Sequence, residues 1–299
     1  MVSMGIKSIN NRADHRLSVV LTLLSGGAAL LLALIVLFLV TEAWPFLMSS
    51  WRDGASLGLF QSQGWYPLEG KFGMLPMILA SLAVTLGAIV VALPIGLASA
   101  IFLEFYAVAH IARVFRLLLN VLAGIPSVVF GLWGLTRLVP LITQWQPPGA
   151  SLLAALLVLS LMILPTITLT STSALASVPK DLLAGSVALG LRRKTQILHI
   201  MLPAARSGIT GGALLATARA LGETMAVLMV AGNVVQIPTG LFEPVRVLTA
   251  NIALEMAYAM DDHRASLFTS GLLLTLLVWF LSWGAHRVNR HRREAGHHG

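Results

Sequence analysis

Long uninterrupted runs of apolar residues dominate the pattern along the chain. Five charge-free runs each meet the roughly 20 residues that an α-helix needs to cross a bilayer. They span residues 17–41, 72–103, 117–136, 151–179 and 265–285. A sixth apolar stretch, residues 208–238, contains only two charged side chains. Because such continuous runs lack the alternation of β-barrel strands, we predict an all-α integral membrane protein with six transmembrane helices.

Composition supports this prediction and narrows the chemistry. The chain is 57% hydrophobic and 11% charged, with a mean hydropathy of +0.85, whereas soluble domains carry about 25% charged residues. It has no cysteine, its eight histidines form no His-Glu-x-x-His pattern, and no Gly-rich phosphate loop ending in Lys is present. We therefore expect no metal, no cofactor and no catalytic residue, and the energy for any transport must come from a partner or from a gradient.

Basic residues are distributed unevenly between the predicted loops, which sets the orientation. With the N-terminus in the cytoplasm, fourteen Lys and Arg fall in inner segments and five in outer ones. This bias predicts that both termini are cytoplasmic. We divide the chain into an N-terminal tail (1–16), a transmembrane domain (17–286) and a basic C-terminal tail (287–299). The net charge of +8 thus reflects topology, and no basic folded face indicates nucleic-acid binding.

Prolines inside the apolar runs predict where helices break. Pro126 interrupts the third run and Pro165 the fourth, and non-helical backbone at membrane depth is tolerated where it lines a cavity. Hydroxyl side chains within the runs are candidates for lining a path, although such hydroxyls often bond their own backbone. They are Ser81, Thr85, Ser127, Thr166 and Thr168. Four glycines are predicted to allow close helix packing: Gly131, Gly134, Gly211 and Gly212.

The outer connections are predicted to carry little function. Residues 42–71 contain Trp65 and two other tryptophans, which suit anchoring at the membrane interface, and we assign no site to them. In the second outer segment, 239–264, the apolar positions of 247–260 suit a helix that lies at the interface or closes a pathway.

The longest inner loop, residues 177–207, has the signals of two short helices joined by a turn. Pro179 suits a helix start, Gly190 a helix stop, and Leu202-Pro203 the end of a second amphipathic segment. This second segment mixes apolar and basic side chains, as does a helix that docks into a groove of a partner. The alternative is that the basic residues only enforce topology.

Arg219 and Glu223 are the strongest candidates for a functional site. A charged side chain at the centre of a membrane helix costs roughly 2.5–3.5 kcal/mol on insertion scales and usually marks function. Their spacing of four residues places both on one helix face, where they can meet. Arg219 lies about 16 Å along the helix from Gly208, near the middle of a core of about 30 Å. The alternative is that the two charges only neutralise each other at a helix interface.

Several motifs resemble a known family of transport proteins. Gly190, followed after nine residues by Ile200-x-Leu202-Pro203, resembles the inner-loop signature of ABC importer permeases, although Ala184-Gly185-Ser186 stand where Glu-Ala-Ala is usual. Further segments, including Arg-Ala-Leu-Gly-Glu-Thr-Met-Ala at 219–226, resemble phosphate-specific permeases of the PstC type over residues 74–286. The others are residues 123–131, 163–166, 202–209, 249–253 and 263–264.

The resemblance implies partners and residue roles. A permease of this type pairs with a PstA-type permease in the bacterial inner membrane, sits on a dimeric ATPase and receives phosphate from an extracytoplasmic binding protein. By this resemblance the inner loop 177–207 couples to the ATPase. Its coupling positions are Ala184, Gly185, Ser186, Gly190, Ile200, Leu202 and Pro203. The implied substrate path comprises Arg219, Glu223, Thr224, Ser127 and Thr166.

Phosphate chemistry suits the charged pair. The planar guanidinium of Arg219 can bond two phosphate oxygens at once. We hypothesise that Glu223 holds Arg219 when the path is empty and then accepts a hydrogen bond from a protonated phosphate oxygen, which fully ionised sulfate cannot supply. Other functions remain open: a permease for sulfate or molybdate, or a secondary transporter or channel, which needs neither an ATPase nor a docking loop.

Overall fold

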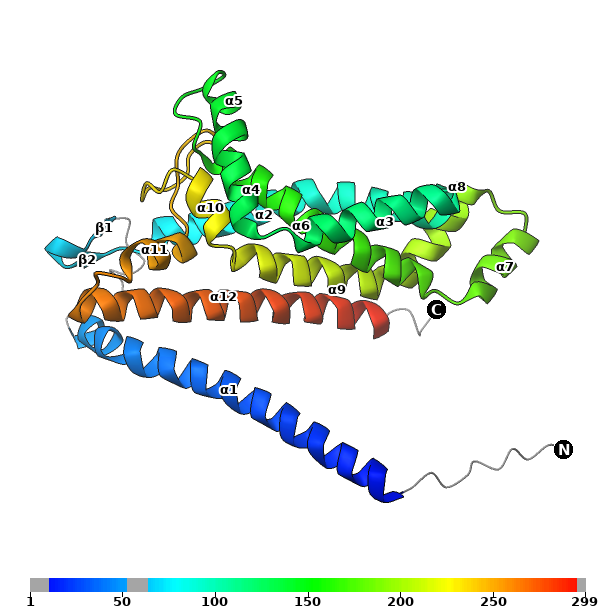
Figure 1. Cartoon of the computed structure of the whole chain (residues 1–299), viewed down its shortest axis with the longest axis horizontal. Coiled ribbons are helices and arrows are strands. Elements are labelled where there is room, and N and C mark those ends of the chain that lie inside the picture. Colours follow the sequence, from blue (N-terminus) through cyan, green and yellow to red (C-terminus); the bar gives the residue numbers. More distant parts are fainter. Residues whose placement is uncertain (1–10, 53–63, 295–299) are drawn as a thin grey trace.

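The computed structural model describes residues 11–52 and 64–294 and is mostly helical (Figure 1). Five long helices form its body: α1 (Asn11–Arg52), α2 (Leu75–Ile101), α6 (Leu152–Ala176), α9 (Leu202–Leu221) and α12 (Asp261–Glu294). The parts of the predicted tails that fall on residues 1–10 and 295–299 lie outside the described residues.

Shorter elements connect the long helices. The short α-helices are α3 (Ala109–Gly124), α4 (Ser127–Trp133), α5 (Val139–Thr143), α7 (Lys180–Ala188), α8 (Arg193–Gln196), α10 (Met225–Val230) and α11 (Leu248–Glu255). Three π-helical turns follow α2, α4 and α8 directly: η3 (Phe102–Tyr106), η4 (Gly134–Leu138) and η5 (Ile197–Met201). A 3₁₀ turn, η2 (Pro67–Glu69), joins β1 (Trp65–Tyr66) to β2 (Lys71–Phe72), and the two strands form an antiparallel hairpin.

Four helices in the described part of the chain are long and apolar enough to cross a membrane. These spans are His15–Ser49, Leu75–Tyr106, Leu152–Ala176 and Asp261–Trp283. Ala109–Gly124 and Ser127–Thr143 qualify only together, and they are bent by 93° at the intervening residues. The break predicted at Pro126 is thereby confirmed. α9 is less apolar, because it contains two arginines and three glycines, so the predicted count of six spans stays a prediction.

The predicted interruption at Pro165 is wrong. α6 runs without a break from Leu152 to Ala176, and Pro165 is buried within it. Proline removes one backbone donor and weakens a helix locally. Here α2, α3, α9 and α10 all pack against α6. These tertiary contacts compensate for the missing backbone donor, so the helix continues past Pro165.

Close approach of neighbouring helices explains three of the four predicted glycines. A Cβ atom at Gly212 would lie 2.1 Å from Thr170 Oγ1 of α6, and one at Gly134 would lie 2.6 Å from a methyl group of Val158. At Gly131 it would lie 2.9 Å from a backbone atom of α10. Gly211 faces open space, with no atom within 4 Å of such a Cβ, so it allows no close packing within the described chain and the role predicted for it stays a prediction.

The inner loop is only partly as predicted. α7 begins directly after Pro179, and Gly190 follows its end with a left-handed φ of +69°, which glycine adopts without strain. Leu202-Pro203, however, does not end a helix, because α8, η5 and α9 continue into one another. Pro203 lies in the first turn of α9, directly after the wide π-helical turn, where its missing N–H disrupts the helix least.

The two ends of the molecule differ in what they carry (Figure 1). The first turn of α1, the last turn of α12, and α7 and α8 lie at one end, whereas the hairpin and α11 lie at the other. α1 contacts α12 near the C-terminal end of α1, and toward its N-terminus it diverges from α12 and from the other helices (Figure 1). The cytoplasmic side predicted for α7 and for the outermost turns of α1 and α12 stays a prediction.

Candidate functional site

The helix that carries Arg219 ends before Glu223. α9 ends at Leu221 with Gly222 as its cap, and α10 begins at Met225, so residues 222–224 form a break. The two side chains therefore do not share a helix face, and no ion pair among the described residues joins them. The pair predicted from the spacing of four is thus wrong in this conformation, because the helix ends at Gly222, a poor helix former.

Each of the two charges lies at a helix end instead. Glu223 Oε1 accepts a hydrogen bond of 3.1 Å from the backbone N–H of Ala226, in the first turn of α10. Arg219 is exposed in the last turn of α9. A carboxylate at a helix start and a cation at a helix end both complement the helix dipole. Within the described residues, neither Glu223 Oε2 nor the Arg219 guanidinium has a bonding partner, so both can bind a ligand.

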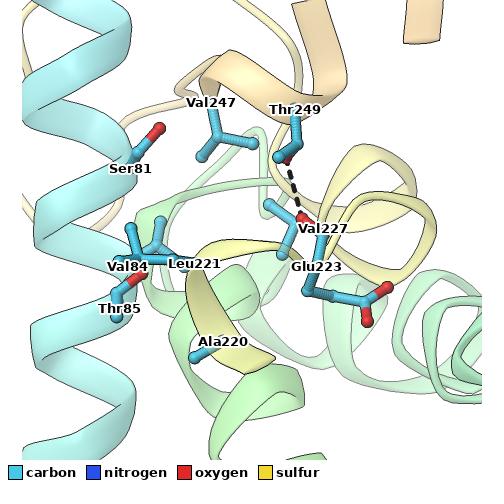
Figure 2. Close-up of a pocket in the computed structure, with 9 residues that line it drawn as sticks. All are labelled: Ser81, Val84, Thr85, Ala220, Leu221, Glu223, Val227, Val247 and Thr249. Atoms are coloured by element: carbon cyan, nitrogen blue, oxygen red, sulfur yellow. Dashed lines mark hydrogen bonds between the residues drawn. The ribbon is translucent and has the colours of Figure 1, made fainter. Parts of the chain in front are cut away.

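A small pocket lies beside the break (Figure 2). Its empty space amounts to about 180 Å³, but this space is so narrow that only a water-sized group fits inside. α2, α9, the break, α10 and the start of α11 with the residue before it contribute its walls. The lining residues are Ser81, Val84, Thr85, Ala220, Leu221, Glu223, Val227, Val247 and Thr249. The pocket thus collects hydroxyl groups against apolar walls.

Two hydrogen bonds from the start of α11 hold the pocket walls together. Thr249 Oγ1 donates to the backbone carbonyl of Glu223 (2.8 Å), and the N–H of Leu248 donates to Ser81 Oγ (3.0 Å). Neighbouring residues of α11 therefore bind both the break and α2. The carboxylate of Glu223 points away from Ser81 and Thr85 (Figure 2), so the pocket and the carboxylate lie on different sides of the break.

The other predicted pathway residues are dispersed. Thr224 directly precedes α10, and its hydroxyl donates to the carbonyl of Gly222 (3.3 Å). Ser127 begins α4, which packs against α10, and Thr166 lies half-buried on α6. Among the hydrogen bonds of the described chain, none joins any two of the five predicted pathway residues. Only Arg219, Glu223 and Thr224 come together, at the break.

The predicted coupling residues do not form one surface. Ala184 and Gly185 are exposed on α7, whereas Ser186 is buried and its hydroxyl donates to the carbonyl of Leu183 (2.7 Å). Gly190 is exposed at the turn. Three large apolar side chains near it are exposed at the same end: Leu182, Val187 and Leu189. The remaining coupling residues lie further on, with Ile200 and Leu202 half-buried and Pro203 exposed.

Arg193 makes a contact that the charge pattern did not predict. Its guanidinium donates to the backbone carbonyl of Phe105 and lies over the ring of Tyr106, 5.0 Å from the ring centre. Both acceptors belong to η3, which continues α2. The inner loop is therefore bound to the end of α2.

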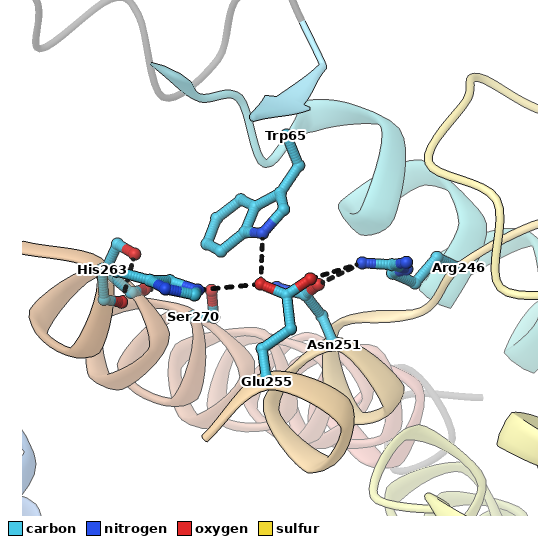
Figure 3. A network of polar contacts seen from close by, with 7 residues as sticks. Trp65, Arg246, Asn251, Glu255, His263 and Ser270 are labelled. Atoms are coloured by element: carbon cyan, nitrogen blue, oxygen red, sulfur yellow. Dashed lines mark hydrogen bonds and ion pairs between the residues drawn. The ribbon is translucent and has the colours of Figure 1, made fainter. Parts of the chain in front are cut away.

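A buried carboxylate organises the opposite end of the molecule (Figure 3). The side chain of Glu255 is 8% exposed. Its Oε1 accepts from Arg246 Nη1 (2.7 Å), and its Oε2 contacts Trp65 Nε1 (2.6 Å) and His263 Nε2 (2.8 Å). Arg246 also donates to the carbonyl of Asn233.

The sequence patterns did not predict this network. The assignment of no site to residues 42–71 overlooked Trp65, which is buried and bound to Glu255. The helix predicted within 247–260 is present as α11, although Glu255 on it is buried against other segments. A lone Glu among apolar residues of a helix was the signal, because such a group requires partners.

Three comparisons place this geometry among known proteins. Residues 92–294 match the sequence model of the family described as binding-protein-dependent transport system inner membrane component. The chain is 36% identical over 285 residues to a probable ABC transporter permease protein, YqgH, of Bacillus subtilis, covering 92% of each chain. It is 33% identical over 272 residues to the phosphate transport system permease protein PstC of Mesorhizobium japonicum, covering 83% of each.

Solved structures agree on the fold. A chain of the MetNI methionine ABC transporter in an inward-facing conformation superposes with a TM-score of 0.58 at 21% sequence identity. The match covers 71% of this chain and 92% of that one.

Proposed function

Because the chain belongs to the family of binding-protein-dependent transport inner membrane components, and so is an ABC importer permease, we propose that it is the permease subunit of an ATP-driven importer of inorganic phosphate. The observation that carries the choice of phosphate is the similarity to PstC proteins over most of the chain. The exposed arginine at the 222–224 break supplies the chemistry for an anion.

In this proposal Arg219 binds the anion, and Glu223 distinguishes a protonated anion from a fully ionised one. The guanidinium offers paired donors to two oxygens of a tetrahedral anion. Glu223 keeps Oε1 on Ala226, which leaves Oε2 to accept a hydrogen bond from a protonated phosphate oxygen. The ion pair between the two residues is not required, because each charge is also complemented by a helix end.

ATP is hydrolysed by a separate subunit in this proposal. The inner loop 177–207 docks on a dimeric ATPase, and the exposed apolar side chains around α7 supply the contact. A PstA-type permease completes the pathway, and an extracytoplasmic phosphate-binding protein delivers the anion. The complex lies in the bacterial inner membrane, with residues 1–16 and 287–299 as cytoplasmic tails and 17–286 as the transmembrane domain.

The experiment that tests the proposal is uptake of radiolabelled phosphate by vesicles that hold the assembled complex. Arg219→Ala should abolish ATP-dependent uptake, while assembly and ATPase activity persist. Arg137→Ala removes another exposed arginine, from η4, and this variant should transport phosphate normally. Normal uptake by Arg219→Ala would remove this residue from the path, and uptake of sulfate instead of phosphate by the unmodified complex would refute the substrate.

Docking on the ATPase is tested by a charge placed on the exposed apolar surface. Leu189 is 78% exposed, so Leu189→Asp should leave the fold intact but weaken co-purification of the ATPase. Leu68→Asp, at a fully exposed leucine of the opposite end, is the control and should co-purify normally. Equal co-purification of both variants would show that this surface does not dock the ATPase.

A further inference from the structure

Nearly all buried hydroxyls in the described chain have a hydrogen-bond partner. Those with a partner are Ser81, Ser151, Ser160, Thr168, Thr172, Ser186, Thr249, Ser266, Thr269 and Ser270. Within the same residues, the hydroxyls of two buried residues, Thr85 and Ser171, have none, and of these two only the oxygen of Ser171 is fully enclosed. Thr85 is 2% exposed. An unpaired buried polar group is unfavourable, so each of the two calls for an explanation.

The backbone does not satisfy Thr85 as it satisfies its neighbour. A hydroxyl in a helix commonly donates to the carbonyl four residues earlier. Ser81, one turn before Thr85 on α2, does so with the carbonyl of Met77 (2.7 Å). The hydroxyl of Thr85 makes no such bond, and its residue lines the pocket beside the break. Ser171 lines no part of that pocket, and its oxygen is fully enclosed.

Thr85 is the hydroxyl of this pocket whose proton is free. A hydroxyl has a single proton to donate. That of Ser81 is bound to Met77, and that of Thr249 is bound to the carbonyl of Glu223. The remaining lining residues are apolar apart from Glu223, whose carboxylate points away from Thr85 (Figure 2). A free donor between apolar walls suits a ligand that brings an oxygen acceptor.

We infer that Thr85 donates a hydrogen bond to an oxygen of the transported oxyanion, and that the pocket beside it is a second anion contact. This inference rests on the proposed function. The carboxylate of Glu223 lies on the far side of the break, so the anion passes from the charged side of the break to the hydroxyl side. A neutral donor holds an anion less tightly than a guanidinium does, and a transport path needs sites that the substrate can leave.

The pocket must widen before an anion enters, because only a water-sized group fits in the present conformation. Two hydrogen bonds join the start of α11 to its walls, from Thr249 to the break and from Leu248 to Ser81. Movement of α11 away from both α2 and the break would break the two bonds. It would also free the Ser81 oxygen and the Thr249 hydroxyl within the same pocket.

The test compares variants that remove or keep the hydroxyl of Thr85. Thr85→Val preserves the shape, Thr85→Ser preserves the hydroxyl, and Ser171→Ala removes the other unpaired hydroxyl. Phosphate moved per ATP hydrolysed is measured in vesicles holding the complete complex with saturating binding protein. Loss of one hydrogen bond to a charged group predicts a decrease of roughly tenfold or more for Thr85→Val. Thr85→Ser and Ser171→Ala should match the unmodified protein, and ATPase activity should stay the same.

Each outcome decides the inference. Normal phosphate transport by Thr85→Val would show that the pocket holds only water, while the proposed function would stand. Failure of both Thr85→Val and Thr85→Ala to assemble, with assembly of Thr85→Ser, would make the hydroxyl structural and overturn the inference. Absence of phosphate uptake by the unmodified complex would refute the proposed function and this inference with it.

Discussion

Removal of the Glu255 carboxylate should destabilise the end of the molecule that carries the hairpin and α11. The carboxylate holds donors from three segments, namely Trp65 of β1, Arg246 before α11 and His263 of α12. Glu255→Ala leaves all three donors without this acceptor. Breaking a buried ion pair by removal of one partner costs about 3–5 kcal/mol.

The lower end of that range applies here. Arg246 keeps its bonds to the carbonyl of Asn233 and to Asn251 Oδ1 when Glu255 is removed. Its side chain is also 20% exposed, so water compensates part of the loss. At about 2 °C per kcal/mol for a chain of this size, a loss of about 3 kcal/mol lowers the midpoint of thermal unfolding by roughly 6 °C.

Thermal unfolding of the purified chain in detergent measures this change. The matched control is Glu69→Ala, which removes a 60% exposed carboxylate paired with Lys71 in the neighbouring hairpin. Exposed pairs contribute about 0–1 kcal/mol, so the control should shift the midpoint by at most about 2 °C. Glu255→Ala combined with Arg246→Ala should cost less than the sum of the single changes. Equal small shifts for Glu255→Ala and Glu69→Ala would refute the reasoning.

Two further predictions concern packing and pH. Gly212→Ala places a Cβ 2.1 Å from Thr170 Oγ1 and should destabilise the chain by about 1–3 kcal/mol, whereas Gly211→Ala meets no atom within 4 Å and should not lower the unfolding midpoint in the same assay. Hydrogen bonds from the hydroxyl and the backbone N–H of Thr239 lower the pKa of Glu243. These contacts therefore stabilise the loop fully at pH values above the ordinary carboxyl pKa. The stabilisation is lost as the pH falls through the lowered pKa of Glu243. Thr239→Val should raise the pKa of Glu243 toward its ordinary value in an NMR titration, and an unchanged pKa would contradict this cause.

Local signals in the sequence predicted the features that depend on neighbouring residues. The apolar runs gave the long helices, Pro126 marked the bend of 93°, and Pro179 and Gly190 bounded α7. Each depends on the hydropathy or the backbone preference of a few adjacent residues. The same local rule failed at Pro165, because packing by four other helices keeps α6 continuous.

Features that depend on distant residues could not be predicted. Trp65 and Glu255 are 190 residues apart in the sequence and meet only in the folded chain. The pocket likewise needs α2, the break and α11 to be placed together. The spacing of Arg219 and Glu223 led to a wrong prediction of a shared helix face, because that prediction assumed that α9 continues through Gly222.

The bond between Arg193 and the end of α2 makes that helix a rigid mechanical link between the inner loop and the pocket. Its inner end is fixed to the inner loop through the carbonyl of Phe105 and the ring of Tyr106, and Thr85 lies on the same continuous helix. The 20 residues between Phe105 and Thr85 correspond to about 30 Å. A displacement of the inner loop is therefore transmitted along α2 to the pocket. Transmission requires that the bond from Arg193 holds and that α2 does not bend at Pro94.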